Sequence, residues 1–131
     1  MKKDIKIPQV NDVYVAAVKE YNDEYKTNNW NAYIINDKDV DLEMILIVSK
    51  GYTQDKETSL MRHKLEKLPK KSYAKIELMQ EDVLALNNEF KVTFFEDNEM
   101  FDKTYLFRKN TINEKALKPI PLMEAKGVLV K

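Results

Sequence analysis

The chain has 131 residues, which is enough for one domain and too few for two ordinary ones. Hydrophobic residues make up 44% of it and aromatic residues 10%, which argues against disorder because this much apolar side chain can offset the entropy cost of folding. Its 22 basic and 22 acidic residues exclude an overall charge that would draw it to nucleic acid or an anionic membrane. We expect a single domain over residues 1–131, with a core over about 12–108 and a C-terminal tail over 109–131 packed on it.

The chain contains no cysteine, so disulfides and thiolate metal sites are excluded. Residues 1–12 contain three lysines, but no apolar stretch of the kind that a secretory leader requires follows them. No other stretch approaches the roughly 20 apolar residues of a membrane span. We therefore expect a cytoplasmic protein without a membrane partner.

Residues 12–25 fit two kinds of element. Val13, Ala17 and Tyr21 recur at a spacing of four, which suits a helix, and Asp12 could cap it. The valines and tyrosine at 13–15 favour a strand instead. We favour the strand.

Residues 30–36 and 42–49 both alternate with a period of two, which predicts a pair of strands. Residues 37–41 between them, with the sequence DKDVD, have the chemistry of a turn, so the pair is expected to form a hairpin. In the second strand the pattern predicts one face with Leu42, Met44, Leu46 and Val48, and the other with Glu43, Ile45, Ile47 and Ser49.

Residues 58–68 are again ambiguous, between a short amphipathic helix and a ragged edge strand. Residues 72–79 alternate as a half-buried strand, with Ala74, Ile76 and Leu78 against Tyr73, Lys75 and Glu77. Later alternating segments predict strands at 89–95 and 100–107 around the polar loop 96–99, one helical turn near 113–117, and a terminal edge strand at 127–130.

These short segments, separated by polar turns, predict an all-β fold. We expect a single immunoglobulin-like antiparallel β-sandwich of about seven strands, with at most one or two short helical turns. Some strands carry apolar residues on both faces, such as Ile45 and Leu46, or Phe94 and Phe95. Their second face needs a cover, either from the tail 109–131 or from a second subunit, so a homodimer is left open.

A resemblance follows from three segments, WNAYIINDKDVDLEMILIVSKGY, LEKLPKKSYAKIEL and EFKVTFF. Their succession over residues 13–107 resembles the strand layout of small bacterial immunoglobulin-like sandwiches, with an L-P-x-x-S entry before a middle strand. It is also similar to short uncharacterised bacterial proteins, some of which are labelled phenylalanyl-tRNA synthetase subunits. The label implies no aminoacylation here, because the chain is far shorter than a synthetase core and its two arginines, Arg62 and Arg108, are too few for the nucleotide motifs.

Two acidic segments raise the question of a cation site. Residues 37–41 have the spacing D-x-D-x-D, and residues 96–102 contain three acids and an asparagine before a further aspartate. Neither has the glycine and closing glutamate of a helix-loop-helix calcium loop. Asp and Asn are common in turns because their side chains bind the local backbone, so we interpret both as turns and expect no metal.

Catalytic motifs are absent from the sequence. His63, the sole histidine, lies between Arg62 and Lys64 and is interpreted as a solvated surface residue. No serine has the glycines of a nucleophile elbow. Two glycines in the whole chain also exclude phosphate-binding loops, so we expect neither an enzyme nor a cofactor.

The basic segment 60–75 is the strongest candidate for binding, with six basic residues against one acid. Lysines here could contact phosphates while an outward tyrosine stacks on a base, or they could protect a sheet edge from pairing with another chain. The candidate partner-binding residues are Arg62, Lys64, Lys67, Lys70, Lys71 and Tyr73.

The sequence therefore predicts a non-catalytic binding or scaffolding module with a protein partner. The alternative is an RNA-associated accessory protein that binds phosphates through residues 62–75.

Overall fold

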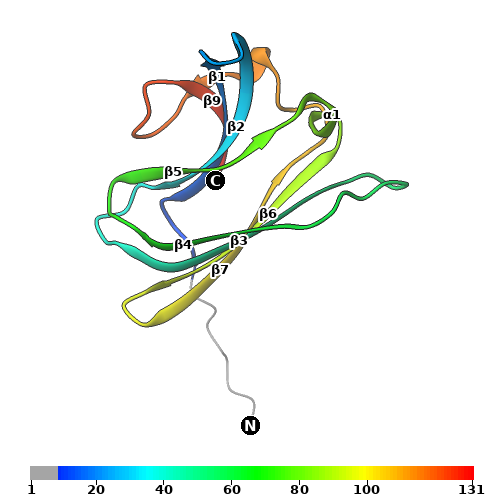
Figure 1. Ribbon diagram of the computed structural model, residues 1–131. Coiled ribbons are helices and arrows are strands. Elements are labelled where there is room, and N and C mark those ends of the chain that lie inside the picture. The colour runs from blue at the N-terminus through cyan, green and yellow to red at the C-terminus, as the bar shows by residue number, and fades with distance from the viewer. Residues whose placement is uncertain (1–8) are drawn as a thin grey trace.

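The computed structural model describes residues 9–131, so residues 1–8 of the expected domain lie outside the described part. Two antiparallel sheets of five and four strands face each other, which confirms the all-β sandwich (Figure 1). Residues 9–131 form nine strands rather than about seven. They are β1 Val13–Asn22, β2 Thr27–Asn36, β3 Leu42–Tyr52, β4 Met61–Leu68, β5 Ser72–Met79, β6 Asn87–Glu96, β7 Glu99–Phe107, β8 Lys118–Pro119 and β9 Lys126–Val130. The helical turns are α1, Glu81–Leu84, and a 3-10 turn, Glu114–Ala116.

The strand order is β5-β2-β1-β9-β8 in the first sheet, here called sheet A, and β4-β3-β6-β7 in the second, sheet B. Both ambiguous segments are strands, β1 and β4. The chain crosses between the sheets after β2, β4, β5 and β7. Strands β2 and β3 therefore lie in different sheets, and the hairpin expected for residues 30–49 is wrong. Strands β4 and β5 are edge strands of opposite sheets. The connection from β3 to β4 extends past the end of the sheets as a long arm (Figure 1).

The main core fills the space between the sheets. Its aromatic side chains pack in pairs: Phe90 meets Phe107 edge to face at 5.8 Å, and Phe94 stacks on Phe101 at 5.2 Å between ring centroids. Each such ring, fully buried, contributes roughly 1.5–3 kcal/mol through removal of its apolar surface from water. Strand β7, which ends at Phe107 beside the expected core boundary at residue 108, supplies part of this packing.

Strand β1 is buried on both faces. Val13, Val15 and Ala17 face the main core, whereas Ala16 and Val18 belong to a second buried cluster on the outer face of sheet A. Residues from the tail cover this outer cluster, with Ile120 buried and Met123 and Ala125 packed against it.

Strand β9 of the tail pairs directly with β1, from Val15 with Val130 to Val18 with Gly127. Gly127 permits this approach, since a Cβ there would lie 2.5 Å from the carbonyl oxygen of Ala17. The tail is thus a structural part of sheet A.

The predicted faces of β3 are confirmed from Met44 to Ser49, but Leu42 and Glu43 lie on the opposite faces from those predicted relative to these residues. Leu42, Ile45, Ile47 and Ser49 are buried, whereas Met44 and Leu46 face outwards and are 53% and 41% exposed. Met44 has a φ of 50°, and the register with β6 shifts between Glu43 and Leu46. This bulge adds one residue to β3 and reverses the alternation that follows it.

A buried hydrogen bond ties the last strand of sheet B to the first strand of sheet A. The Tyr105 hydroxyl on β7 donates to the carbonyl oxygen of Val13 at 2.6 Å, and both residues are almost fully buried. Burial raises the pKa of the Tyr105 phenol above its ordinary value, because the charged phenolate would be desolvated.

We predict that Tyr105→Phe lowers the free energy of unfolding by about 1–3 kcal/mol, because it leaves the buried Val13 carbonyl without this donor. Urea denaturation measures the change. Folding raises the phenol pKa, so the hydroxyl contributes below the ordinary tyrosine pKa of 10.0 and its contribution is lost as the pH rises above that value. The difference in free energy of unfolding between wild type and Tyr105→Phe should therefore become smaller above pH 10.0.

Tyr73→Phe is the matched control, since Tyr73 is 44% exposed and its hydroxyl makes no hydrogen bond within residues 9–131. We expect a change within about 0.5 kcal/mol for it. Equal effects of the two substitutions would contradict the role given to Tyr105.

Candidate functional site

The six candidate binding residues do not form one surface. Arg62 and Lys64 face outwards from sheet B, where they pair with Val48 and Leu46 of β3. Tyr73 lies on the outer face of sheet A, edge to face with Tyr33 at 5.8 Å between ring centroids. Arg62 and Tyr73 are therefore on opposite faces of the sandwich.

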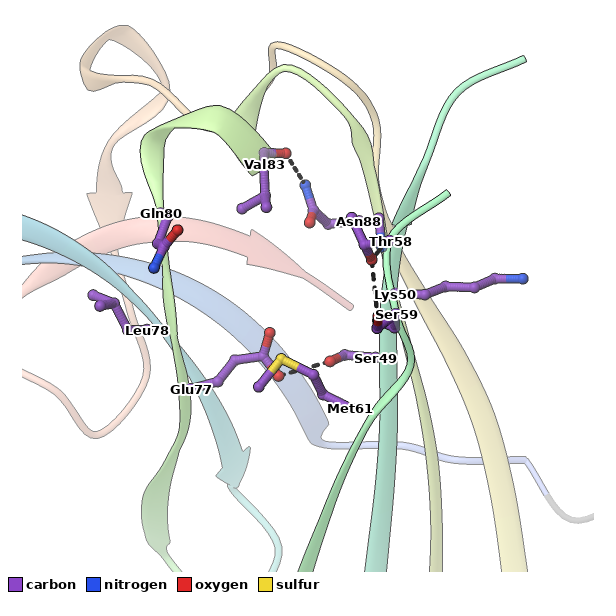
Figure 2. A pocket seen from close by; sticks show the side chains of 11 residues that line it. Ser49, Lys50, Thr58, Ser59, Met61, Glu77, Leu78, Gln80, Val83 and Asn88 are labelled. Carbon is purple, nitrogen blue, oxygen red and sulfur yellow. Dashed lines mark hydrogen bonds between the residues drawn. The ribbon is translucent and has the colours of Figure 1, made fainter. Parts of the chain in front are cut away.

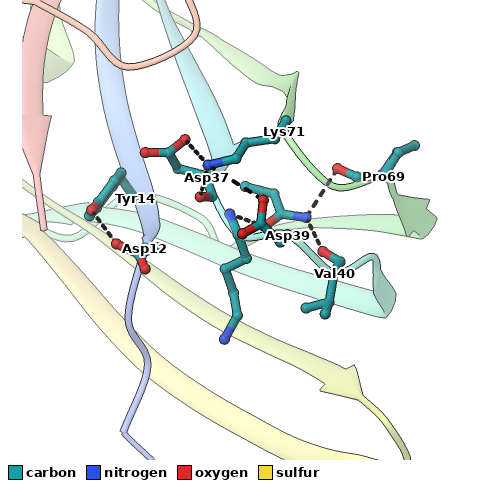
Figure 3. A network of polar contacts seen from close by, with 9 residues as sticks. Asp12, Tyr14, Asp37, Asp39, Val40, Pro69 and Lys71 are labelled. Atoms are coloured by element: carbon teal, nitrogen blue, oxygen red, sulfur yellow. Dashed lines mark hydrogen bonds and ion pairs between the residues drawn. The ribbon is translucent and has the colours of Figure 1, made fainter.

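Lys71, in the turn between β4 and β5, meets the acidic turn between β2 and β3 (Figure 3). Its Nζ lies 3.2 Å from Oδ1 of Asp37 and 3.9 Å from Oδ1 of Asp39, and it also donates to the Asp37 carbonyl at 2.8 Å. The hydrogen bond with Asp37 raises the pKa of the Lys71 ammonium. The Lys71 ammonium is therefore paired with residues of the domain itself.

Asp41 contacts Lys70 of this turn and Lys67 near the end of β4. The backbone N–H of Lys70 donates to Asp41 Oδ1 at 2.9 Å, and Lys67 Nζ lies 3.2 Å from Asp41 Oδ2. The backbone hydrogen bond from Lys70, followed by the side chain of Lys67, lowers the pKa of the Asp41 carboxyl. The basic segment and the D-x-D-x-D segment thus partner each other.

A buried asparagine fixes the same two turns. Asn36, at the end of β2, is fully buried, and its side-chain amide donates to the carbonyl oxygens of Val40 at 2.9 Å, Leu68 at 3.1 Å and Pro69 at 3.0 Å. Its Oδ1 accepts from the backbone of Lys38. A single polar side chain therefore links the crossing after β2 to the crossing after β4, which the sequence pattern did not reveal.

The loop of the second acidic segment is a tight hairpin turn. Asp97 and Asn98 have φ values of 49° and 61°, which is the backbone of a type I′ turn. Glu96 pairs with Lys38, with 2.7 Å between Oε1 and Nζ. Within residues 9–131 no group of three or more acidic or histidine side chains is arranged to hold a metal ion.

We predict that calcium at about 5 mM, above the roughly 10⁻³ M dissociation constant of weak sites, leaves the melting temperature unchanged, because lysines already satisfy the carboxylates of residues 37–41. Differential scanning calorimetry with and without the ion measures this, with magnesium as the control. A rise with calcium that Asp41→Asn abolishes would contradict it.

The outer face of sheet B carries a group of exposed apolar side chains. Phe95 on β6 pairs with Met100 on β7 and with Glu43 on β3, next to the bulge at Met44. We call Met44, Leu46, Phe95 and Met100 the outer apolar patch; their exposed fractions are 53%, 41%, 37% and 55%.

Three cations adjoin the outer apolar patch. Leu46 pairs with Lys64, and the next outward residue of β3, Val48, pairs with Arg62 on one side and Lys91 on the other. None of the three makes an ion pair with another residue in 9–131. They can therefore meet an anionic group from outside the domain.

A pocket of about 420 Å³ opens between β3, β5 and α1 (Figure 2). Glu77 reaches across it from β5, and its Oε1 accepts a hydrogen bond from Ser49 Oγ on β3 at 2.6 Å. His63 Nε2 on β4 lies 2.7 Å from the same oxygen. This cluster joins the edge strands of the two sheets.

The sequence interpretation of these residues was wrong in two respects. His63 is not a solvated surface residue, since its side chain is 25% exposed and bound to Glu77. Glu77 was predicted on the solvated face of its strand, yet its side chain is 14% exposed, whereas Leu78 is 47% exposed. The register of β5 with β2 shifts between Ala32 and Tyr33, and this irregularity turns Glu77 inwards.

The cluster does not have the order of a catalytic triad. In a triad the imidazole lies between the hydroxyl and the carboxylate, whereas here Ser49 and His63 both bind one oxygen of Glu77. The arrangement holds a buried carboxylate in place and gives the serine no adjacent imidazole base.

Comparison of the chain with protein-family models, with curated proteins and with solved structures found no match. Among residues 9–131, no helix has the length and apolar character needed to cross a membrane. The function is therefore argued from the two surfaces just described, the outer apolar patch and the pocket.

Proposed function

We propose that the chain is a cytoplasmic, non-catalytic binding module that holds a partner protein on the outer face of sheet B. The outer apolar patch is the observation that carries this proposal. Single exposed apolar residues are common on protein surfaces, but a contiguous group on one sheet face is typical of an interaction site.

The position of the C-terminal tail, which covers sheet A and not sheet B, supports the same proposal. Residues 118–130 cover the outer face of sheet A, over Ala16 and Val18. No described residue covers Leu46 or Phe95 on sheet B. The sequence shows that both sheets have apolar residues on two faces, and only one of them has its cover within residues 9–131.

The cations beside the patch define the chemistry of the partner. Arg62, Lys64 and Lys91 favour a protein surface with acidic side chains around an apolar centre, because complementary charge steers association and excludes other partners. Arginine at such an interface can bind a carboxylate through two parallel hydrogen bonds. Two of the six candidate residues, Arg62 and Lys64, keep a binding role in this proposal.

The strand order supports an immunoglobulin-like fold as part of the proposal. In sheet B the order β4-β3-β6-β7 corresponds to the C′-C-F-G sheet of those domains, and β1-β2-β5 in sheet A to their A-B-E strands. Domains of this architecture serve many binding functions, so the partner is argued from the surface alone.

RNA is the second candidate, because the three unpaired cations lie on the same face as the exposed ring of Phe95, on which a base could stack. The observations favour protein, since the ammonium groups of Lys67 and Lys71 are paired with Asp41 and Asp37. Tyr73, the base-stacking candidate, is on the opposite face.

We predict that Phe95→Glu lowers capture of the partner at least tenfold, because it places a charge in the apolar centre of the interface. The immobilised chain is incubated with extract of its own cells, and captured proteins are quantified by mass spectrometry. Tyr25→Glu is the matched control, since Tyr25 is 72% exposed in the β1–β2 turn and the change adds the same charge.

A protein counts as the partner when wild type and Tyr25→Glu retain it equally and Phe95→Glu does not. Its affinity, measured with the purified protein, should also fall in Arg62→Glu and Lys64→Glu. Equal capture by all variants would refute the surface. Sedimentation of wild type as a dimer and of Phe95→Glu as a monomer would identify a second copy as the occupant.

The RNA alternative predicts bound nucleic acid after purification at low salt without nuclease. The ratio of absorbance at 260 and 280 nm would then be raised, and a high-salt wash would lower it, because phosphate contacts weaken with salt. We expect a clean protein spectrum. A raised ratio that returns to normal in Arg62→Glu would move RNA ahead of protein.

A further inference from the structure

The pocket between β3, β5 and α1 lies between the sheets and is separate from the outer apolar patch, so its role does not depend on the proposed function. Its volume of about 420 Å³ is in the range of pockets for small molecules. Met61 and Val83 give it apolar walls, while Glu77 and Asn88 supply polar groups on opposite sides (Figure 2). The Leu78 side chain points away from Glu77, on the other side of β5.

Three hydrogen-bond donors at the pocket are used within the protein, whereas the side-chain donors of Gln80 and Ser59 make no hydrogen bond within residues 9–131. Ser49 Oγ donates to Glu77, and the backbone N–H of Gly51 donates to Thr58 Oγ1 at 2.8 Å. Thr58 Oγ1 donates in turn to the carbonyl of Ser59. These groups have no proton left for a ligand.

Asn88 is fixed with its acceptor free. The residue is 6% exposed, and its Nδ2 donates to the carbonyl oxygens of Val83 at 2.8 Å and Leu86 at 3.1 Å. These two acceptors determine the orientation of the amide, because a flipped amide would place oxygen against oxygen. Asn88 Oδ1 accepts no hydrogen bond within residues 9–131 and lines the pocket.

The charge of Glu77 is the second feature. Its Oε1 accepts a hydrogen bond from Ser49 Oγ and lies 2.7 Å from His63 Nε2, and no residue in 9–131 donates to Oε2. A neutral imidazole can donate from Nε2, so the histidine bond does not require a compensating positive charge. A buried carboxylate is costly unless it is paired.

The one lysine at the pocket is directed elsewhere. Lys50 Nζ lies 3.5 Å from Glu57 Oε1 and 5.5 Å from the centre of the Tyr52 ring. Figure 2 shows its side chain extending away from the pocket. Glu77 therefore has no lysine or arginine partner within the pocket, and its neighbour His63 brings a positive charge only when its imidazole is protonated.

We propose that this pocket binds a small organic cation, a primary ammonium group carried on a short apolar chain. The ammonium would donate to the free oxygen of Glu77, with the free oxygen of Asn88 as a second acceptor on the opposite side of the pocket. The chain would pack against Met61 and Val83. An anion would be repelled by the carboxylate of Glu77, and an alcohol would bring it no positive charge.

The test uses n-butylammonium chloride as the probe and 1-butanol as the neutral molecule of the same shape. Backbone amide signals are followed by ¹H–¹⁵N NMR during titration of the ¹⁵N-labelled chain. We expect saturable shifts at Gly51, Leu78 and Val83 with butylammonium, and an affinity at least tenfold weaker for butanol. Equal responses to the two probes, or shifts outside the pocket, would overturn the proposal.

Two variants separate loss of binding from loss of folding. Glu77→Gln removes the charge, and we expect at least a tenfold loss of butylammonium affinity. Met61→Lys keeps Glu77, Ser49 and His63 and supplies a tethered ammonium from an exposed wall position beside Glu77 (Figure 2), so it should block the probe to the same extent. Tyr25→Glu, at a residue that does not line this pocket, should bind as wild type does. Unchanged affinity in folded Glu77→Gln or in Met61→Lys would overturn the proposal.

Discussion

Burial of β1 on both of its faces is the constraint on which the rest of the structure depends. Every residue from Val13 to Val18 except Tyr14 is buried, with alternate side chains in the main core and in the cluster outside sheet A. Such a strand needs sheet B on one side and a separate cover on the other. The tail provides that cover and pairs with β1, so the outer face of sheet B has no equivalent cover within the described chain.

The charged segments show how an apparent binding motif can have a structural use. Residues 37–41 and the lysines at 67–71 lie at the chain crossings after β2 and after β4, which Asn36 holds together through the carbonyls of Leu68 and Pro69. Once adjacent, opposite charges partner each other, and each exposed pair adds only about 0–1 kcal/mol. Of the cations left for a partner, Arg62 and Lys64 on β4 belong to the basic segment, whereas Lys91 on β6 lies outside it and was not indicated by the sequence.

Alternation and turn chemistry were sufficient to predict the fold class, because both report on local backbone and burial. They could not predict the phase of β3 beyond Leu42 or of β5 beyond Lys75, since one added residue in a bulge reverses the faces without changing the composition. The pocket was missed for this reason. Glu77 is inward only because of such an irregularity, and its contacts to Ser49 and His63 join three strands that are distant in sequence.

The pairing of β9 with β1 also determines when the protein can fold during synthesis. β1 is among the first strands to leave the ribosome, whereas β9 follows more than a hundred residues later. Until then β1 has one neighbour and an uncovered apolar face, while sheet B already has all four of its strands. A nascent chain in this state exposes a strand edge that can pair with other chains, so its yield in cells should depend on chaperones that shield β1.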